Sequence, residues 1–375
     1  MNKYDCIVVG AGVGGMTAAY HLAKLGLQTL LIEKSPLPRY KPCGGGVSPI
    51  IAKYFDFDLT PAIALQVHTI RYTWKRGDGV EVNLPTAMWM VHRGQFDQFL
   101  IDHCLRQGVE VKDNTAVTGI NFDSHHWQVQ TTDGIFLGQY LIGADGVTGS
   151  MTQWLGLKQQ RPHPGLVLEI TGLEPPPPEA TFEFGLLKDG YIWTFPKPDG
   201  YTICGGIFRG YQSKALHSSL INYATQEGID LTHSHVTPHW LGLWNGDHPL
   251  HAQNALLVGE AASIADPLTA EGIRPSIWTG LKAAEAIHQS LNGDTNALAT
   301  YTETIHQEWG ADMMWAQRLA TLIYSAPSLA YKGGIKRPQT SQLMPKILAG
   351  ELRYGDIANE AIKQFSGSLI PGRGR

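Results

Sequence analysis

The stretch CIVVGAGVGGMTAAYHLAKLGLQTLLIEK, residues 6–34, contains the pattern that decides the fold. An apolar run over residues 5–9 predicts a buried strand, and the glycines that follow it predict a turn. Residues 14–26 have the composition of a helix, and residues 28–32 form a second apolar run that ends at Glu33. This order predicts a βαβ unit, with the glycines at the junction between the first strand and the helix.

The spacing of Gly10, Gly12 and Gly15 predicts a turn that binds a dinucleotide. The first glycine permits the tight turn, the second lets backbone approach a diphosphate, and the third lets the helix pack closely on the strand. Free N–H groups at the start of the helix would face the phosphates. Glu33 follows the third glycine by 18 residues, so its carboxylate can accept a hydrogen bond from a ribose hydroxyl. The nucleotide contacts expected in this unit are Gly10, Gly12, Val13, Gly14, Gly15, Glu33 and Lys34.

Composition limits the partners that this chain can have. Its 375 residues are 43% hydrophobic and 17% charged, as in a folded protein with about two or three domains. A net charge of −4 argues against nucleic acid as the main partner. No apolar run reaches the roughly 18 residues of a membrane-spanning helix, and strand residues begin almost at once, so we expect no signal peptide and a cytoplasmic location. The cysteines have no metal-ligand spacing, which predicts free thiols and no metal site at Cys6, Cys43, Cys104 and Cys204.

The chain alternates between two kinds of sequence, which predicts that one domain is inserted into another. Segments rich in alternating aromatic and β-branched residues are typical of an antiparallel sheet with one buried face. We predict an α/β protein with a Rossmann-like nucleotide-binding domain, an inserted antiparallel β-sheet domain that binds the substrate, and C-terminal helices. The expected ranges are 1–60, 92–160 and 250–290 for the first domain, 61–91 and 161–249 for the second, and 291–375 for the helical region.

Two further stretches place ligand contacts at strand ends. GQYLIGADGVTGS ends an apolar strand with a Gly-Ala-Asp-Gly turn, and NALLVGEAASIADPLTAEGIRPS begins with a short apolar strand at residues 255–258. In the second stretch an acidic residue, a loop and a new helix follow, and the start of that helix would stabilise an anionic or electron-rich group. The contacts expected from these stretches are Asp145, Gly146, Gly259, Glu260, Pro267, Gly272 and Ile273.

In this order, the three stretches resemble the FAD-dependent oxidoreductases of the p-hydroxybenzoate hydroxylase type. The resemblance implies that the first motif holds the ADP part of FAD, the GADG stretch supports the cofactor from the side, and the third motif contacts the ribityl chain. The third motif of that group is usually Gly-Asp, whereas this chain has Gly259-Glu260, so its loop must shift to keep the contact. VHRGQFDQFLIDHC resembles the group's Arg-x-x-Phe-Asp segment, which implies that Arg93 lies near the cofactor; a surface arginine at a helix start is the alternative.

One segment resembles the geranylgeranyl reductase family within that group. Tyr40-Lys-Pro-Cys43-Gly-Gly matches the family's Tyr-x-x-Cys-Gly-Gly segment, and ADPLTAEGI resembles its Asp-Pro loop. Backbone without side chains at Gly44 and Gly45 suits contact with a flat ring. The resemblance implies a catalytic role for Cys43, Gly44 and Gly45, with the first two also touching the flavin. An inert buried thiol at Cys43 is the alternative.

A second segment, with Tyr191, Trp193 and Phe195 at alternate positions, matches the family's Tyr-x-Trp-x-Phe-Pro-Lys pattern. Alternate residues of a strand share one face, so these rings are expected to line an apolar substrate cavity, with an ordinary core as the alternative. We expect Pro196 to end the strand. The resemblance covers about residues 4–290 and leaves the remaining C-terminal residues unmatched.

The resemblance implies an enzyme that reduces isolated C=C bonds of a polyprenyl group by hydride transfer from reduced FAD. Cys43 is then a candidate for the flavin face or for a proton relay. There is no second dinucleotide motif, so NADPH would bind transiently, and a small electron carrier such as ferredoxin is equally possible as the donor. The substrate stays open among a free diphosphate, a chlorophyll-type ester, a quinone tail and an archaeal-type lipid.

Two other functions stay open at this point. An FAD-dependent monooxygenase that hydroxylates an aromatic or quinone ring would share the fold and the first and third motifs. A flavin halogenase has related motifs, but no lysine here is placed by a matching one. A non-catalytic protein that binds flavin or lipid, with FAD binding weakened by the altered third motif, is the second alternative.

The C-terminal region carries a possible membrane contact. Residues 313–325 have a helical pattern with one apolar face, formed by Trp315, Leu319, Leu322 and Ile323. From Lys332 to the end there are eight Lys or Arg against three Asp or Glu. An apolar helix beside a basic tail fits peripheral attachment to anionic lipid. A helix packed on the sheet with a solvated tail is the alternative.

Overall fold

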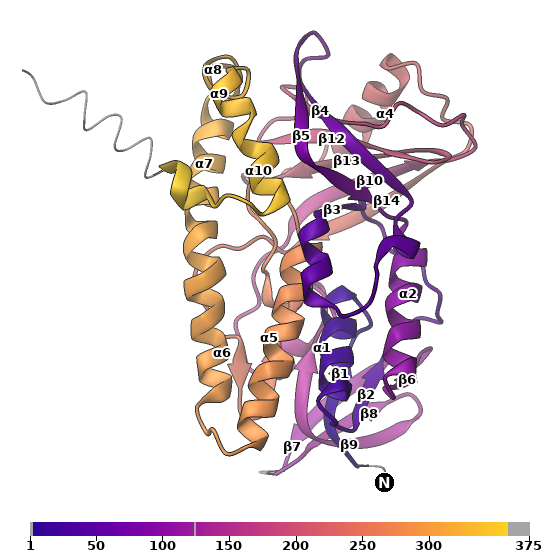
Figure 1. The fold of residues 1–375 in the computed structure, drawn as a ribbon, viewed down its shortest axis with the longest axis vertical. Helices are drawn as coiled ribbons and strands as arrows, with labels where there is room; N and C mark the ends of the chain where they lie inside the picture. Colours follow the sequence, from indigo (N-terminus) through magenta and orange to yellow (C-terminus); the bar gives the residue numbers. More distant parts are fainter. Residues whose placement is uncertain (1–2, 124, 359–375) are drawn as a thin grey trace, which may run out of the picture.

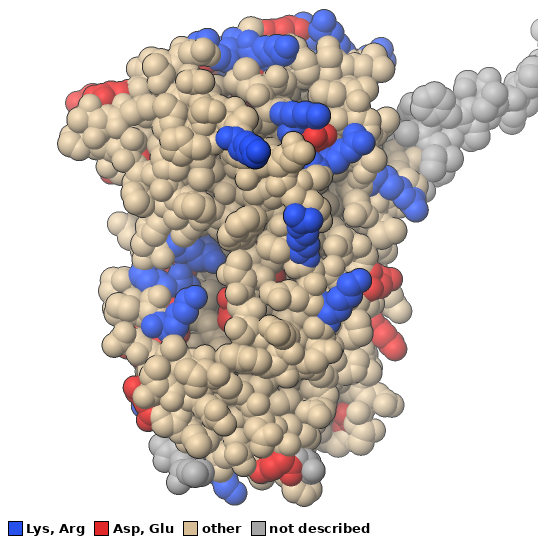
Figure 2. Space-filling view, turned by 180° about the vertical axis from the view of Figure 1, so that it is seen from behind, with Lys and Arg blue, Asp and Glu red and all other residues tan. Residues whose placement is uncertain are grey.

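A computed structural model describes residues 3–123 and 125–358 and contains two β-sheets with helices packed around them. The first sheet lies in the lower half of the view in Figure 1, and the second lies in the upper half. The helices that follow the second sheet in the chain run along one side of both sheets. The acidic and basic side chains of the opposite face are shown in Figure 2, where a hollow lies at mid-height with Lys and Arg side chains beside it.

The first sheet has a parallel centre, in the order β16–β9–β1–β2–β6, with antiparallel neighbours β15 on β16 and β8 on β9. Its central strands are buried on both faces, as expected for parallel strands covered by helices. The strands are β1 (Lys3–Val9), β2 (Thr29–Ile32), β6 (Glu110–Lys112), β7 (Val117–Phe122), β8 (Trp127–Thr131), β9 (Gly134–Gly143), β15 (His251–Ala252) and β16 (Ala255–Leu257).

Helices α1 (Val13–Lys24) and α5 (Ile273–Leu291) pack against each other beside this sheet. Their backbones approach so closely that a Cβ atom added at Gly280 would lie 2.3 Å from the carbonyl oxygen of Gly14. Because β1, β9 and β16 run parallel, their carboxyl ends meet at one edge of the sheet. The glycine turn, the GADG stretch and the Gly-Glu stretch therefore come together, which confirms the predicted mixed α/β fold.

The second sheet is antiparallel except for one parallel pair, β4 with β11, and has the order β14–β10–β13–β12–β11–β4–β5–β3. The prediction that Pro196 ends its strand is wrong, because β12 continues to Lys197 and Pro196 pairs with Tyr201. The strands are β3 (Gly46–Val47), β4 (Leu65–Trp74), β5 (Asp78–Met90), β10 (His163–Ile170), β11 (Glu179–Phe184), β12 (Gly190–Lys197), β13 (Gly200–Ile207) and β14 (Ser234–Leu241).

The two faces of the second sheet have different partners. Helix α4 (Leu216–Gln226) covers one face, where Leu216 and Leu220 pack on Ile192 and Ile203 in a separate apolar cluster. The opposite face contributes Phe182, Tyr191 and Phe195 to the large core that it shares with the first sheet. The remaining helical elements before α5 are α2 (Arg93–Arg106), α3 (Met151–Trp154), η1 (Pro49–Tyr54), η2 (Thr60–Ala62) and η3 (Gly259–Ala262).

The C-terminal part is helical, as the pattern predicts. Trp315, Leu319 and Ile323 of α7 pack on the core, but Leu322, expected on the same face, is 65% exposed. No helix among the described residues is long and apolar enough to cross a bilayer. Part of the predicted basic tail, residues 359–375, lies outside the described residues. The elements are α6 (Ala297–Ile305), η4 (His306–Gly310), α7 (Ala311–Ser325), α8 (Pro327–Ala330), η5 (Tyr331–Ile335), α9 (Pro338–Ser341) and α10 (Leu343–Ala349).

Candidate active site

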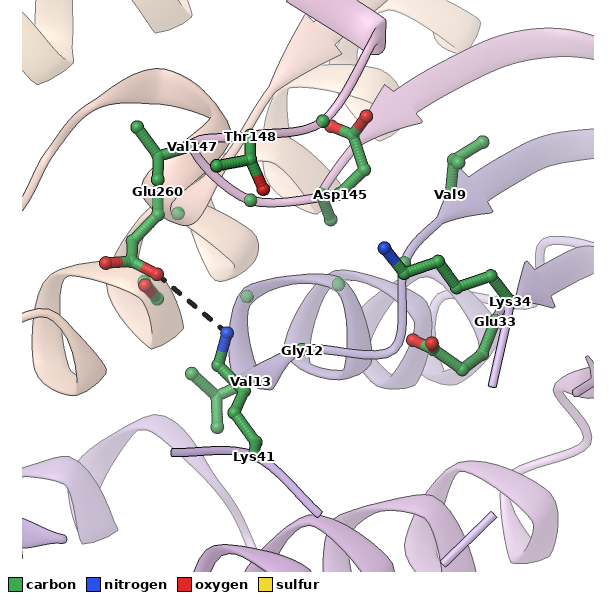
Figure 3. Close-up of a pocket in the computed structure, with 18 of the residues that line it drawn as sticks. Val9, Gly12, Val13, Glu33, Lys34, Lys41, Asp145, Val147, Thr148 and Glu260 are labelled. Atoms are coloured by element: carbon green, nitrogen blue, oxygen red, sulfur yellow. Dashed lines mark ion pairs between the residues drawn. The ribbon is translucent and has the colours of Figure 1, made fainter. Parts of the chain in front are cut away.

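A cavity of about 500 Å³ follows the carboxyl edge of the first sheet and reaches the second sheet at β14. Figure 3 shows residues from distant parts of the chain around it, with Glu33 and Lys34 at one end and Glu260 at the other. Most of the residues expected to bind a cofactor line this cavity: Gly10, Gly12, Val13, Gly14, Gly15, Glu33, Lys34, Cys43, Arg93, Asp145, Gly146, Gly259, Glu260, Gly272 and Ile273.

The glycine turn leaves no room for side chains toward the protein. A Cβ atom at Gly15 would lie 2.0 Å from the carbonyl oxygen of Gly10, and one at Gly10 would lie 2.5 Å from that of Ala144. At Gly12, in contrast, the nearest protein atom to an added Cβ is 3.9 Å away. Gly12 is also the N-cap residue of α1, and no side chain caps that helix end. Its N–H groups and the positive end of the helix dipole are thus available to an anion in the cavity.

Glu33 organises the end of the cavity beside β2. Its carboxylate accepts hydrogen bonds from the N–H groups of Ala11, at 2.9 Å, and Ser35, at 3.1 Å. The guanidinium of Arg39 donates to the carbonyl oxygen of Ala11 at 2.7 Å. Its Nε atom is buried, lies 3.4 Å from Glu33 Oε2 and makes no hydrogen bond. Arg39 and Glu33 thus form an ion pair next to the glycine turn.

Asp145 presents a second buried polar atom that lacks a partner. Its Oδ2 atom accepts from the N–H of Met151 at 2.9 Å, and its Oδ1 atom has no hydrogen bond. Burial raises the pKa of this carboxyl, and the N–H donors around it lower the pKa again only in part. The side-chain-free turn, the uncapped helix and the Asp145 Oδ1 atom, which has no hydrogen bond, together fit a dinucleotide such as FAD.

The other end of the cavity holds a charged cluster. Glu260, at the start of the 3₁₀ turn after β16, lies 3.9 Å from Lys41 Nζ and 3.9 Å from His239 Nε2. Figure 3 shows the Lys41–Glu260 pair reaching across the cavity in front of Val13. Burial lowers the pKa of His239, and Lys41 and Arg93 lower it further, while Glu260 acts in the opposite direction.

A second, mainly apolar cavity of about 100 Å³ adjoins the first on the second sheet. Gly44, Gly45, Trp193 and Phe195 line it, together with Leu348 of α10. Gly44, expected against the flavin, does not line the first cavity. Tyr191 lies behind this wall, stacked on Phe208, and donates a hydrogen bond to the carbonyl oxygen of Thr269. Pro267 is buried and lines neither cavity. The residues that line both cavities are Cys43, His239, Ala270, Gly272 and Ile273.

Cys43 therefore stands at the junction of the two cavities, and its surroundings are polar. The N–H of Gly45 donates to its sulfur at 3.3 Å, and the four cysteines of the chain are all free thiols. Arg93 contacts Cys43 and forms a buried bidentate ion pair with Asp97, at 2.7 and 2.9 Å. Burial alone would lower the pKa of Arg93, but Asp97 and Cys43 outweigh it and raise that pKa. The Arg93 side chain is thus buried and lines the first cavity, so Arg93 is not a surface arginine.

Several residues that line the first cavity were not singled out from the sequence. Arg39 and Lys41 lie in the loop that carries Cys43, and a basic residue in a glycine-rich loop after the first βαβ unit is a usable signal. His239 comes from β14, some 200 residues later, and no local pattern distinguishes it from other strand histidines. Thr115 and Val117 line the cavity from the start of β7. Among the described residues, no group of three or more His, Cys, Asp or Glu could hold a metal ion.

Comparison with known proteins agrees with this geometry. The chain belongs to the FAD binding domain family, whose profile matches residues 3–314. An uncharacterised protein of Methanosarcina barkeri is 31% identical over 307 residues, which cover 78% of this chain and 76% of that protein. A digeranylgeranylglycerophospholipid reductase of Thermoplasma acidophilum is 27% identical over 333 residues, covering 78% and 80% of the two chains. The protein is thus an FAD-dependent oxidoreductase distantly related to these reductases.

Solved structures share the fold. A geranylgeranyl bacteriochlorophyll reductase-like protein of Thermoplasma acidophilum superposes with a TM-score of 0.77 at 22% identity, over 93% of this chain and 92% of its own. The flavin-dependent brominase Bmp2 superposes with a TM-score of 0.72 at 17% identity, over 98% and 100% of the two chains. At these identities the similarity establishes the fold and leaves the reaction to be argued from the site.

Proposed function

We propose that this protein uses FAD to reduce C=C bonds in a polyprenyl group of the geranylgeranyl type. The observation that carries the proposal is the junction of the two cavities: a dinucleotide cavity opens at Cys43 onto an apolar one walled by Trp193 and Phe195. A flavin ring and an unpolarised alkene would meet at such a junction. The names of the relatives that act on digeranylgeranylglycerophospholipids support the same substrate class.

Reduced FAD, when bound, supplies the hydride for this chemistry. The chain's own residues bind and orient the two reactants. The backbone around Gly12 and the start of α1 would hold the diphosphate, and Glu33 and Asp145 would serve the ADP end and the side of the cofactor. Gly259 and Glu260, with the helix start at Gly272 and Ile273, would serve its other end. The apolar walls exclude water and hold the alkene in place, which is the larger part of the task for an unactivated bond.

Few groups at the junction could move the proton that accompanies the hydride. Cys43 lines both cavities, and Gly44 and Gly45 shape the turn beside it, so we retain the assignment of these three residues as the catalytic segment. Tyr191, Trp193 and Phe195 remain the proposed substrate stripe, with Tyr191 acting from behind the wall. The reductant, either NADPH or a ferredoxin-type protein, and contact with a membrane surface stay predictions.

The test is an anaerobic flavin titration. The purified protein, loaded with FAD, is bleached with dithionite, and geranylgeranyl diphosphate or a digeranylgeranylglyceryl phospholipid is then added. We expect the flavin band to return with the lipid and a saturated product to be found by mass spectrometry. A band that returns only with oxygen, together with a hydroxylated aromatic product, would move the assignment to a monooxygenase. A protein that takes up no FAD would support the non-catalytic alternative.

A further inference from the structure

A buried lysine behind the glycine turn has no assigned role. Lys197, the last residue of β12, is 4% exposed and lines neither cavity. Its ammonium donates to the carbonyl oxygens of Gly44, at 2.9 Å, and Val91, at 2.8 Å. None of the ion pairs among the described residues involves Lys197, although a buried cation without a carboxylate partner is costly. The free-energy cost of burying this cation indicates that the Lys197 ammonium has a specific role at this position.

The two hydrogen bonds connect Lys197 to Cys43 through a single peptide unit. The carbonyl of Gly44 accepts from Lys197, and the N–H of the same peptide, that of Gly45, donates to the sulfur of Cys43 at 3.3 Å. A hydrogen bond to the carbonyl end of a peptide polarises its N–H end and strengthens the second bond. The positive charge of Lys197 therefore polarises the Gly44–Gly45 peptide and strengthens the hydrogen bond from Gly45 to the Cys43 sulfur.

The turn itself is built around this contact. Gly45 has a φ of +75°, and an added Cβ would lie 2.5 Å from Lys197 Nζ and 2.2 Å from the carbonyl oxygen of Val91. Val91 in turn donates its N–H to the carbonyl oxygen of Gly45 at 2.8 Å. Lys197 thus connects the turn to the segment that leads into α2, and Arg93 at the start of α2 also contacts Cys43.

We propose that Lys197 is the positioning residue of Cys43: its ammonium holds and polarises the Gly44–Gly45 peptide and so controls the reactivity of the Cys43 thiol at the junction of the two cavities. The inference rests on the proposed function only for the catalytic role of Cys43. Burial lowers the pKa of Lys197 to about 8. The other charged or titratable groups that act on it are Cys43, Cys204, Glu169 and Asp199, and Lys197 in turn lowers the pKa of His92.

The experiment measures how fast Cys43 reacts with iodoacetamide, by peptide mapping, in the FAD-loaded protein. The thiolate is the nucleophile, and a nearby positive charge favours it. We expect Lys197→Met to slow alkylation of Cys43 at pH 7 by about tenfold, and the two rates to converge at high pH, where Lys197 is neutral in the parent protein. Lys188→Met removes an equal charge from an exposed position just before β12 and should leave the rate unchanged. Equal rates for Lys197→Met and the parent at every pH would overturn the proposal.

Two further readouts separate positioning from mere stability. If Lys197→Met fails to fold, the parent protein alone decides: its alkylation rate should rise over a wider pH range than a single thiol titration allows, because Lys197 loses its charge over an overlapping range. A rate profile that fits one titrating group would refute the inference. In the folded variant, lipid turnover should fall in kcat, and Lys197→Met should have no further effect in a Cys43→Ser background. Alkylation requires no prenyl substrate, so its result stands apart from that of the proposed reaction.

Discussion

The two cavities that meet at Cys43 are built in different ways. The larger one, about 500 Å³, is walled mainly by backbone and charged groups that follow three strand ends of one parallel sheet. The smaller one, about 100 Å³, is walled largely by side chains from strands of the second sheet and by Leu348 from α10, just over 300 residues after the start of β3. The first site follows from local backbone geometry, whereas the second depends on tertiary packing.

The backbone-built cavity is expected to be the more easily destroyed. Gly15→Ala places a Cβ 2.0 Å from the Gly10 carbonyl oxygen, so the turn must open, and we expect loss of bound FAD and of roughly 3 kcal/mol or more of folding free energy. Gly12→Ala meets no protein atom within 3.8 Å, so it should fold like the parent and bind FAD roughly tenfold more weakly or worse. Flavin absorbance of the purified protein and urea unfolding of the apoprotein measure the two effects. Retention of FAD at parental affinity in Gly15→Ala would contradict this account.

The buried ion pair of Arg93 and Asp97 beside the first cavity gives the next largest effect. Asp97→Asn would leave the Arg93 guanidinium buried without its bidentate partner, which should cost about 3–5 kcal/mol of folding free energy. Asp102→Asn, on the same helix and only half-buried, is the matched control and should stay within about 0.5 kcal/mol of the parent. Urea unfolding of both variants checks the difference. Similar losses in the two variants would show that the Arg93–Asp97 pair has no special weight.

The sequence predicts the first cavity better than the second, because the first depends on local backbone patterns and the second on tertiary packing. The βαβ unit and the strand-end motifs follow local patterns, and the structure brings thirteen of the residues expected from them to one cavity, together with Cys43 and Arg93, which the family resemblance implied. Each of these motifs is a turn after a strand, and parallel pairing then places all the turns at one edge. The sequence shows that Glu260 stands where the resembled group usually has an aspartate, but it does not show that Lys41 and His239 lie close to the Glu260 carboxylate.

The second cavity could be predicted only in outline. The alternation of side chains along β12 predicts that Tyr191, Trp193 and Phe195 share one face of the sheet. It does not predict that Tyr191 stacks on Phe208 behind the wall of the second cavity. Strand length near a proline was also misjudged, because Pro196 lies beyond the pairing with β11, which ends at Thr194, and β12 continues beside β13 to Lys197. The contact of Leu348 with this cavity depends on how the C-terminal helices return over β5, and no short-range pattern records such a return.

The charge on Lys197 offers a thermodynamic way to sharpen the comparison. Its pKa is about 8 in the folded protein and 10.5 when exposed, so the unfolded chain binds more protons between these two values. The free energy of unfolding should therefore increase as the pH rises from about 8 to 10.5, and this group should contribute about 3 kcal/mol of that increase. Lys197→Met should lack the rise, and Lys188→Met should keep it; urea unfolding from pH 7 to 10.5 measures both. A parallel pH dependence in Lys197→Met and the parent would show that the lysine is not held as a buried cation.

The packing-built cavity should tolerate change without loss of the cofactor. Leu348→Trp adds bulk to the cavity wall from α10, far from the glycine turn, so FAD content should match that of the parent while the rate of flavin reoxidation by a prenyl lipid falls by about tenfold. Leu329→Trp, at a position 74% exposed on α8, adds the same ring elsewhere and should leave the rate unchanged. The cavity of about 100 Å³ is smaller than the 300 Å³ or more of ordinary ligand sites, so a long prenyl chain must displace part of this wall to enter. An unaltered reoxidation rate in Leu348→Trp would mean that the lipid reaches the flavin by another route, and the second sheet, not α10, would then be the place to search for it.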